Sequence, residues 1–206
     1  MKFYLSSYKL GRETEQLVRL LPENKRTAYV SNAGDPFTDL ERKRRWEESD
    51  IKDLSKLGLE VEHLDLREYF GQQDKLRTKI SKFGVIWVSG GNLFVLRQAF
   101  KLSGFDEIVR ELAKRKDILY GGYSAGVCIL APTLRGIDIM DDLSAKPYGE
   151  QYETIWDGLG LVDYSIVPHY KSDNSESEAA SKVVEFMVEN KMPFKALRDG
   201  EVIIID

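Results

Sequence analysis

Short hydrophobic runs alternate along the chain with longer segments of mixed polarity. The run at 83–88 is nearly continuous in apolar residues, as expected of a strand buried on both faces. Further runs that predict strands lie at 2–6, 26–30, 59–64, 118–121, 164–168, 194–198 and 201–205. Helical patterns between them cover 38–57, 93–102, 106–116, 125–130 and 176–190. Strands that alternate with helices predict an α/β fold, with a mostly parallel sheet and helices on both of its faces.

Turn and capping residues indicate where several of these elements end. Thr38 with Glu41 three residues later forms a capping box, and Gly58 is expected to end the same helix. Residues 41–48 are almost all charged, which is typical of a solvated helix face. Asp199-Gly200 is a dipeptide typical of hairpin turns, so the last two strands are expected to pair with each other.

Composition limits the class of protein. The 206 residues are 42% hydrophobic and 31% charged, which is typical of a globular chain, and we expect one domain over 1–206. The net charge of −4 argues against a nucleic-acid partner, because such proteins usually carry a basic surplus. No signal-peptide pattern and no apolar run of about 20 residues is visible, so we expect a cytoplasmic protein with no membrane contact.

Cysteine and histidine are scarce in this sequence. The single cysteine, Cys128, excludes an internal disulfide and a multi-cysteine zinc site. His63 and His169 are the only histidines, which leaves little for a histidine-rich metal site, and no metal is expected. Any mechanism that needs a histidine therefore has two candidates.

The strongest chemical motif is Gly122-Tyr123-Ser124-Ala125-Gly126, which matches Gly-x-Ser-x-Gly between a predicted strand and a predicted helix. In that context a sharp turn lifts the serine hydroxyl into the cleft, and small neighbours avoid steric clashes. The backbone N–H of Ala125, at the start of the helix, is placed to stabilise an oxyanion. The alternative is a glycine-rich turn in which Ser124 only caps the helix.

A catalytic serine needs a base and a third group that orients the base. His169 ends a predicted strand at the same sheet edge as Ser124, whereas His63 lies near a strand with no motif around it. Residue chemistry alone does not choose the third group. The acids between Ser124 and His169 are Asp138, Asp141, Asp142, Glu150, Glu153, Asp157 and Asp163.

A second loop, Ser89-Gly90-Gly91-Asn92, follows the buried strand at 83–88. Tandem glycines let a backbone approach a ligand closely, so Gly90, Gly91 and Asn92 are candidates for oxyanion or substrate binding. The alternative is a plain turn into the next helix with Asn92 as its N-cap. Neither a Gly-x-Gly-x-x-Gly fingerprint nor a P-loop is present, and no organic cofactor is expected.

Together with two further segments, these motifs resemble peptidase E, the aspartyl-dipeptidase family of serine peptidases related to cyanophycinase. The matching segments, in the family's order, are Asn32-Ala33-Gly34, Ser89-Gly90-Gly91-Asn92, Gly122-Tyr123-Ser124-Ala125-Gly126, Ala131-Pro132-Thr133-Leu134-Arg135 and Pro168-His169-Tyr170. The resemblance implies a class I glutamine-amidotransferase-like fold, a three-layer sandwich of the flavodoxin-like kind. It also implies Ser124 as nucleophile, His169 as base, and the N–H groups of Gly91 and Ala125 as oxyanion donors.

The resemblance also bears on the third catalytic group and on specificity. The family's triad aspartate follows the Pro-Thr-Leu-Arg segment, which points to Asp138 and leaves Asp141 as an alternative; cyanophycinase-like relatives use a glutamate. The family selects an N-terminal aspartate with an arginine soon after the histidine. Here 171–190 contains no arginine, and Ser175-Glu176-Ser177-Glu178 is acidic. An acidic stretch repels an acidic side chain, so a preference for Asp-X is not expected.

We therefore expect a serine-type peptidase that hydrolyses small peptides or amides through Ser124, His169 and an acid, by way of an acyl-enzyme. One alternative is a catalytically inert sensor or scaffold on the same fold, and another is an esterase or acyltransferase that uses the same serine. Cys128, four residues past Ser124 in the next helix, is expected to pack inside, which disfavours a cysteine-nucleophile amidotransferase. The sequence does not indicate an oligomeric state.

Overall fold

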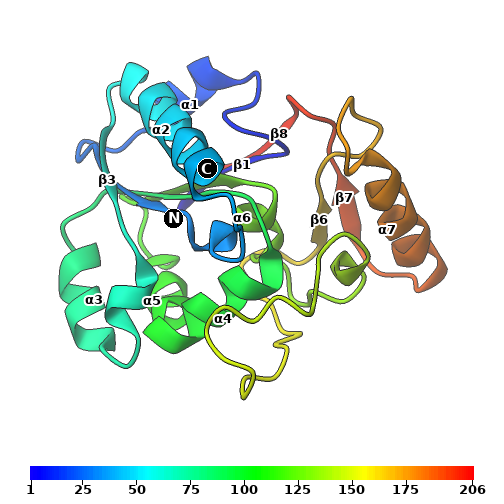
Figure 1. The fold of residues 1–206 in the computed structure, drawn as a ribbon. Coiled ribbons are helices and arrows are strands. Elements are labelled where there is room, and N and C mark those ends of the chain that lie inside the picture. The colour runs from blue at the N-terminus through cyan, green and yellow to red at the C-terminus, as the bar shows by residue number, and fades with distance from the viewer.

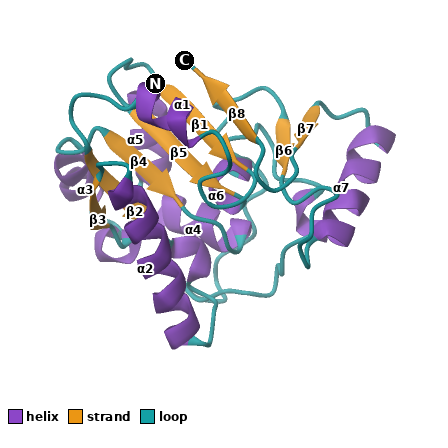
Figure 2. Cartoon of the chain, turned by 90° about the horizontal axis from the view of Figure 1, so that it is seen from above, coloured by secondary structure: helices purple, strands orange, loops and turns teal.

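The computed structural model describes all 206 residues and has a six-stranded sheet between two layers of helices (Figures 1 and 2). The strand order is β3-β2-β4-β5-β1-β8. The strands are β1 Lys2–Ser6, β2 Arg26–Val30, β3 Glu60–His63, β4 Val85–Val88, β5 Leu119–Tyr123 and β8 Val202–Ile205. All neighbours pair in parallel except β8, which is antiparallel to β1. The predicted α/β fold with a mostly parallel sheet is confirmed.

Helices cover both faces of this sheet. They are α1 Thr14–Leu20, α2 Leu40–Lys56, α3 Gln73–Ile80, α4 Leu93–Ser103, α5 Phe105–Leu112, α6 Ala125–Cys128 and α7 Ser177–Glu189, with short 3₁₀ turns η1 Asn32–Gly34, η2 Leu66–Tyr69 and η3 Ile137–Ile139. Helices α1 and α2 bury side chains in the smaller of two cores, and α3 to α7 bury theirs in the larger. No helix has the length and apolar character to span a membrane.

The two cores follow from the alternation of side chains along each strand. In β1, Tyr4 belongs to the smaller core, whereas its neighbours Phe3 and Leu5 belong to the larger. In β4, Trp87 faces the smaller core and Val88 the larger. Successive strand residues point to opposite faces, so a strand buried on both sides needs apolar residues throughout. This explains why β4 reads as an unbroken hydrophobic run.

A second, two-stranded parallel sheet lies beyond β8. It consists of β6 Ser165–Val167 and β7 Phe194–Ala196, and α7 packs beside it at one side of the molecule (Figures 1 and 2). The expected pairing of the last two strands is therefore wrong, because β7 pairs with β6 and β8 pairs with β1. A tight turn is present, since the Glu201 N–H donates to the Arg198 carbonyl at 2.9 Å. A turn signal fixes local geometry only, and here the turn connects two different sheets.

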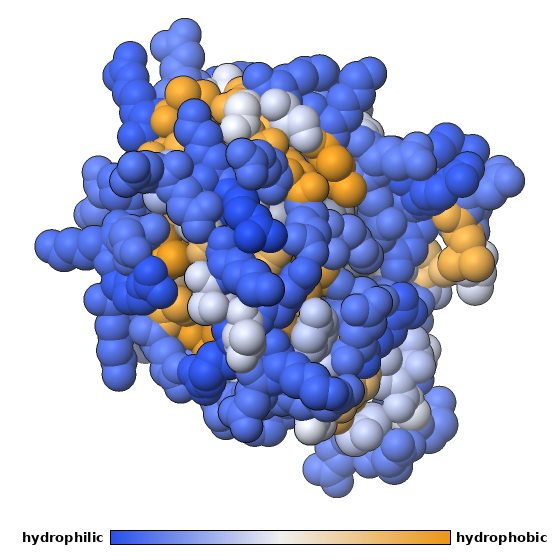
Figure 3. Space-filling model, turned by 90° about the vertical axis from the view of Figure 1, so that its left-hand side faces the viewer, coloured by the Kyte–Doolittle hydropathy of each residue, from blue (hydrophilic) through white to orange (hydrophobic).

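Several predicted helix ends are close to the observed ones. The N-cap of α2 is Asp39, whose carboxylate accepts from the Arg42 N–H at 2.9 Å, so the capping box expected at Thr38 is wrong by one residue. Asn92 caps α4 by accepting from the Val95 N–H at 2.9 Å. Helices α1 and α3 were not predicted from the pattern. The face of the molecule in Figure 3 is largely hydrophilic, with hydrophobic side chains in scattered patches.

Candidate functional site

Ser124 lies at the carboxyl end of β5 in a strained backbone conformation, with φ 50° and ψ −121°. Its side chain is only partly buried, whereas its neighbours are buried. The glycines on either side have a steric reason. A Cβ at Gly122 would lie 2.3 Å from the Val88 carbonyl oxygen, and a Cβ at Gly126 would lie 2.2 Å from the same atom. The turn therefore has the strain and close backbone approach of a nucleophile elbow.

The loop after β4 lies directly against this elbow. A Cβ at Gly90 would be 2.9 Å from the Ser124 Cβ, and one at Gly91 would be 2.5 Å from the Ala33 carbonyl oxygen. The backbone N–H groups of Gly91 and Ala125 donate to no protein acceptor. Two unpaired N–H donors on either side of a serine are what the stabilisation of an oxyanion requires.

Asn92 has a structural part in the same loop. Its side-chain oxygen accepts from the Val95 N–H, and its amide nitrogen donates to the Asp142 carbonyl at 2.8 Å. The side chain is buried and does not line the cavity beside Ser124. The structure therefore brings Gly90 and Gly91 to the serine, and uses Asn92 to fix the loop that carries them.

Ser124 and His169 line one open cavity with a volume of about 600 Å³. The residues around it come from the loop after β1, the η1–α2 segment, the loop after β4, the elbow and the segment before α7. They are Tyr8, Pro36, Phe37, Thr38, Asp39, Arg42, Lys43, Trp46, Gly90, Gly91, Tyr123, Ser124, His169, Asn174 and Glu176. The carboxyl ends of the strands meet here, at the edge where an open parallel sheet binds its ligands.

The His169 ring is buried and is held on one side by a carboxylate. Its Nδ1 lies 2.8 Å from Asp199 Oδ1, and its Nε2 lies 3.6 Å from Glu176 Oε2, a cavity residue. A carboxylate can only accept, so the Asp199 contact places a proton on Nδ1 and turns Nε2 toward the cavity and Glu176. No hydrogen bond joins His169 to Ser124 Oγ in this structure, although both side chains reach the same cavity.

Asp199 is itself held by several polar groups. Ser7 Oγ donates to Asp199 Oδ1 at 2.8 Å, and Asn174 Nδ2 donates to Oδ2 at 3.0 Å. The Asp199 N–H donates to Ser172 Oγ at 2.8 Å, and the His169 N–H donates to Ser7 Oγ at 2.9 Å. These contacts fix the acid and the imidazole relative to each other.

The small sheet explains why Asp199 meets His169. Strands β6 and β7 are parallel, with Val167 opposite Ala196, and the Leu197 N–H donates to the Val167 carbonyl at 2.9 Å. His169 follows β6 by two residues and Asp199 follows β7 by three. Because the carboxyl ends of neighbouring parallel strands lie together, the two side chains share one edge.

Asp138 does not reach His169. Its Oδ1 accepts from the Gly136 N–H at 2.8 Å, within its own turn. No other acid between Ser124 and His169 contacts the imidazole either. The acid beside His169 is therefore Asp199 rather than the expected Asp138. The candidates were acids between serine and histidine, whereas this acid lies 30 residues after His169.

Asp141 fixes the start of α4, next to the glycine loop. Its Oδ2 accepts from the Leu93 N–H at 2.9 Å. Burial, assisted by the negative charges of Glu176 and Asp142, raises the pKa of Asp141 to about 7. This carboxyl group therefore changes its charge near neutral pH at a helix N-terminus close to the candidate oxyanion donors.

We expect Asp141→Asn to stabilise the protein at alkaline pH. A carboxyl group with a raised folded-state pKa stabilises the fold fully below its unfolded pKa, near 4, and this contribution is lost as the pH rises through about 7. Asparagine keeps an oxygen for the Leu93 N–H and cannot ionise. The gain in the free energy of unfolding at pH 8 should be about 1 to 2 kcal/mol, reduced by solvent screening.

Urea unfolding of wild type and Asp141→Asn at pH 5 and pH 8 measures this effect. Asp163→Asn is the matched control, because Asp163 is exposed and its carboxylate forms no hydrogen bond or ion pair within the protein. A difference between Asp141→Asn and wild type that is equal at both pH values would contradict the prediction.

A buried carboxylate ties the elbow to α2. Asp50 accepts from the Tyr123 hydroxyl at 2.5 Å and from the Tyr29 hydroxyl at 2.9 Å, and Lys9 forms an ion pair with its other oxygen. Burial and the negative charge of Asp50 raise the pKa of Tyr123, so the phenol stays protonated and donates. Because Tyr123 immediately precedes Ser124, this contact holds the elbow against α2.

The remaining candidates lie outside the cavity. His63 Nε2 contacts Ser31 Oγ at 2.8 Å, and no cavity residue is involved. Cys128 is buried, its thiol donates to the Ile166 carbonyl at 3.2 Å, and burial raises its pKa. Cys128 thus packs inside, as expected. No three side chains of histidine, cysteine, aspartate or glutamate converge in an arrangement suited to a metal ion.

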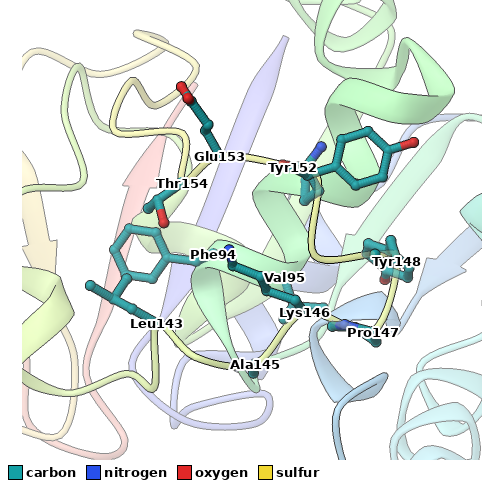
Figure 4. Close-up of a pocket in the computed structure, with 12 residues that line it drawn as sticks. Phe94, Val95, Leu143, Ala145, Lys146, Pro147, Tyr148, Tyr152, Glu153 and Thr154 are labelled. Atoms are coloured by element: carbon teal, nitrogen blue, oxygen red, sulfur yellow. The ribbon is translucent and has the colours of Figure 1, made fainter.

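A second hollow lies under the loop at 143–154. Figure 4 shows Phe94 of α4 beside Leu143, with Tyr148 and Tyr152 on the same loop. Its volume is about 30 Å³, enough for little more than a water molecule. The hollow is too small for a peptide and is lined by neither Ser124 nor His169, so the cavity beside Ser124 is the candidate active site.

The sequence model of peptidase family S51 matches residues 8–206. The chain belongs to peptidase family S51. S51 is a family of serine peptidases, and the resemblance to peptidase E is confirmed at the level of the family. The family does not by itself assign the substrate of this chain.

Curated relatives of this S51 chain match it in part. An uncharacterized peptidase of Listeria monocytogenes is 38% identical over 139 residues, which cover 66% of this chain and 63% of the relative. A Pasteurella multocida uncharacterized peptidase is 28% identical over 72% of this chain and 68% of the relative. A Drosophila melanogaster protein named "probable alpha-aspartyl dipeptidase" is 31% identical over 56% of this chain and 47% of its own length. The match to the Listeria relative thus spans less than two thirds of that protein.

Solved structures match over nearly the whole chain. The structure described as a "putative peptidase E protein" of Listeria monocytogenes superposes with a TM-score of 0.77 at 27% identity, covering 99% of this chain and 93% of that one. A peptidase from an acI-B1 Actinobacterium has a TM-score of 0.68 at 13% identity, covering 99% and 82%. The second likeness concerns the fold alone.

Proposed function

We propose that this S51 chain is a serine peptidase that cleaves small peptides with Ser124, His169 and Asp199. The observation that carries the proposal is the placement of the His169 ring, with Nδ1 on Asp199 and Nε2 toward the cavity that Ser124 lines. The strained Ser124 backbone and the unpaired Gly91 and Ala125 N–H groups support it.

The reaction follows from these placements. His169 Nε2 accepts the proton of the Ser124 hydroxyl as Oγ attacks the carbonyl carbon of the scissile amide. The carbonyl oxygen becomes an oxyanion and accepts hydrogen bonds from the Gly91 and Ala125 N–H groups. His169 then donates its proton to the leaving nitrogen, the C–N bond breaks, and an acyl-enzyme on Ser124 remains. Water, deprotonated by His169, hydrolyses the ester and restores the serine.

Asp199 keeps the imidazole in the required state. Its carboxylate accepts from Nδ1–H, which holds the Nε2 lone pair toward the cavity and stabilises the imidazolium that forms during attack. The mechanism requires a hydrogen bond between Ser124 Oγ and His169 Nε2. Such contacts are often long in structures without a substrate and tighten when the substrate binds.

The cavity is consistent with a short substrate. A volume of about 600 Å³ lies within the usual range for small-molecule sites. The "dipeptidase" in the name of the Drosophila relative agrees with a short peptide. An esterase could use the same serine, histidine and oxyanion donors, and an inert scaffold could have the same fold. The experiment therefore has to distinguish a peptidase from both.

Wild-type protein incubated with a panel of dipeptides and aryl esters, and separately with a fluorophosphonate probe, tests the proposal. We expect hydrolysis of at least one dipeptide and a single probe adduct on the proteolytic fragment that contains Ser124. Cleavage of aryl esters alone would favour the esterase. No turnover and no adduct, with a folded protein, would favour the inert scaffold.

A further inference from the structure

Aromatic rings form a continuous wall along the candidate active site. Each ring contacts the next with centroids about 6 Å apart: Phe37 to Trp46 at 5.8 Å, Trp46 to Tyr123 at 6.4 Å, Tyr123 to Tyr8 at 6.0 Å, and Tyr8 to His169 at 6.0 Å. All of these residues line the cavity with Ser124. Large rings that line a concave site next to a nucleophile are typical of a surface that binds apolar groups.

Two rings of the wall are unusually exposed. Phe37 is 42% exposed and Tyr8 is 45% exposed, whereas most aromatic residues of the chain are buried or partly buried. Exposed apolar surface costs free energy in water, and when it lies in a cavity beside a candidate nucleophile it is available to a ligand. The wall therefore offers apolar surface that the protein itself does not cover.

The order of the rings gives the wall a direction. His169 protonates the leaving nitrogen in the proposed mechanism, so the leaving group lies at the His169 and Tyr8 end. The acyl part of the substrate, which stays on Ser124, then lies toward the opposite end. That end is the corner formed by Phe37 and Trp46.

This corner is held in place by its surroundings. A Cβ at Gly34 would lie 3.0 Å from a Trp46 ring carbon, so the glycine makes room for the Trp46 ring, and Phe37 packs at the same position, 3.6 Å away. Trp46 lies one turn before Asp50 on α2, and Asp50 is hydrogen bonded to Tyr123 of the elbow. The corner and the serine are thus linked through one helix, as expected of a preorganised subsite.

The charges in the cavity do not favour an acidic side chain. Arg42 and Lys43 line it, but Asp39 and Glu176 line it as well. Lys43 is already paired with Asp35 at 2.7 Å, and Arg42 forms no ion pair within the protein. The formal charges of the four lining side chains cancel, so they give the cavity no net positive charge beside Ser124.

We propose that Phe37 and Trp46 form the specificity subsite of this enzyme, and that it takes a large apolar side chain, aromatic or branched aliphatic, on the acyl side of the scissile bond. The inference rests on the proposed peptidase function. It names peptides with a bulky apolar first residue, rather than an aspartate, as the substrate class.

Dipeptides that differ only in the first residue test the subsite: Phe-Leu, Leu-Leu, Ala-Leu and Asp-Leu. We expect wild type to have a kcat/KM for Phe-Leu at least about 10-fold above that for Asp-Leu. Trp46→Ala should lower kcat/KM for Phe-Leu by about 10-fold or more, mainly through KM, with a smaller effect on Ala-Leu. Trp46→Phe should restore most of the loss.

Leu40→Ala is the matched control, because Leu40 lies on the same helix, is 72% exposed and does not line the cavity. It should leave the ratio of Phe-Leu to Asp-Leu unchanged. A preference for Asp-Leu that Arg42→Gln removes would overturn the proposal and assign specificity to Arg42. An equal loss on all four dipeptides in Trp46→Ala would overturn it as well.

Fluorophosphonate labelling separates this inference from the proposed function. Trp46→Ala should still react with the probe at Ser124, because the nucleophile and base are unchanged. If wild type neither labels nor cleaves, the proposed peptidase function fails. If wild type labels and cleaves without an apolar preference, only the subsite fails.

Discussion

Ser124→Ala is expected to lower kcat for a cleaved dipeptide by about four to six orders of magnitude and to abolish fluorophosphonate labelling. Removal of the nucleophile of a serine peptidase removes the covalent route, and the remaining rate comes from the oxyanion donors and substrate binding alone. The Gly91 and Ala125 N–H groups do not depend on the hydroxyl, so KM should change little. Steady-state kinetics and mass spectrometry of the labelled protein measure the two effects.

The same substitution should leave the fold intact. Ser124 Oγ forms no hydrogen bond within the protein, so its loss leaves no buried group unpaired, and the free energy of unfolding should change by less than about 0.5 kcal/mol. Ser81→Ala is a control, because the Ser81 hydroxyl only donates to the Thr78 carbonyl at the end of α3. Labelling that persists in Ser124→Ala would refute the assignment of the nucleophile.

The sequence placed Ser124, His169 and the glycine loop at one edge of the sheet, and their geometry agrees with that placement. The reason is that these groups follow the ends of buried strands, and apolar runs and glycine turns report such ends locally. Gly122 and Gly126 are a direct case. Their spacing around the serine reflects close contact with the Val88 carbonyl, which no other residue type tolerates.

The acid that contacts His169 could not be predicted from local sequence patterns in the same way. Its position depends on the pairing of β6 with β7, and β7 begins 27 residues after β6 ends. The Asp199-Gly200 turn is visible locally, but the partner of each flanking strand is decided by packing with the rest of the chain. The interpretation of 194–205 as a hairpin therefore offered no reason to place the Asp199 carboxylate beside the His169 imidazole.

The aromatic corner was missed for a related reason. The charged run at 41–48 predicts a solvated helix face, and Arg44, Arg45 and Glu48 do form exposed ion pairs on α2. Trp46 interrupts that run and turns toward Phe37 and Tyr123. A single apolar residue in a polar helix segment produces no hydrophobic periodicity, so the pattern does not indicate where its side chain packs. The contacts of Trp46 become visible only when α2 is placed beside the elbow.

Asp199→Asn is expected to lower kcat by about two to four orders of magnitude, with a small change in KM. An amide in place of the carboxylate no longer stabilises the imidazolium, and its NH₂ group would donate to Nδ1 and favour the wrong tautomer. The amide oxygen can still accept from Asn174 Nδ2, and Ser7 Oγ can donate to the Leu197 carbonyl instead, so the loop should hold its shape. A thermal unfolding curve checks that the variant is folded.

Asp138→Asn is the matched comparison, because it makes the same chemical change at the acid that the family resemblance suggests. The amide introduced at this position can still accept from the Gly136 N–H through its side-chain oxygen, so we expect kcat within about threefold of wild type. The rate of fluorophosphonate labelling should fall in Asp199→Asn and not in Asp138→Asn, since attack by Ser124 depends on the base. The reverse pattern, with activity lost in Asp138→Asn and kept in Asp199→Asn, would return the role to Asp138 and require a rearrangement of the η3 turn on substrate binding.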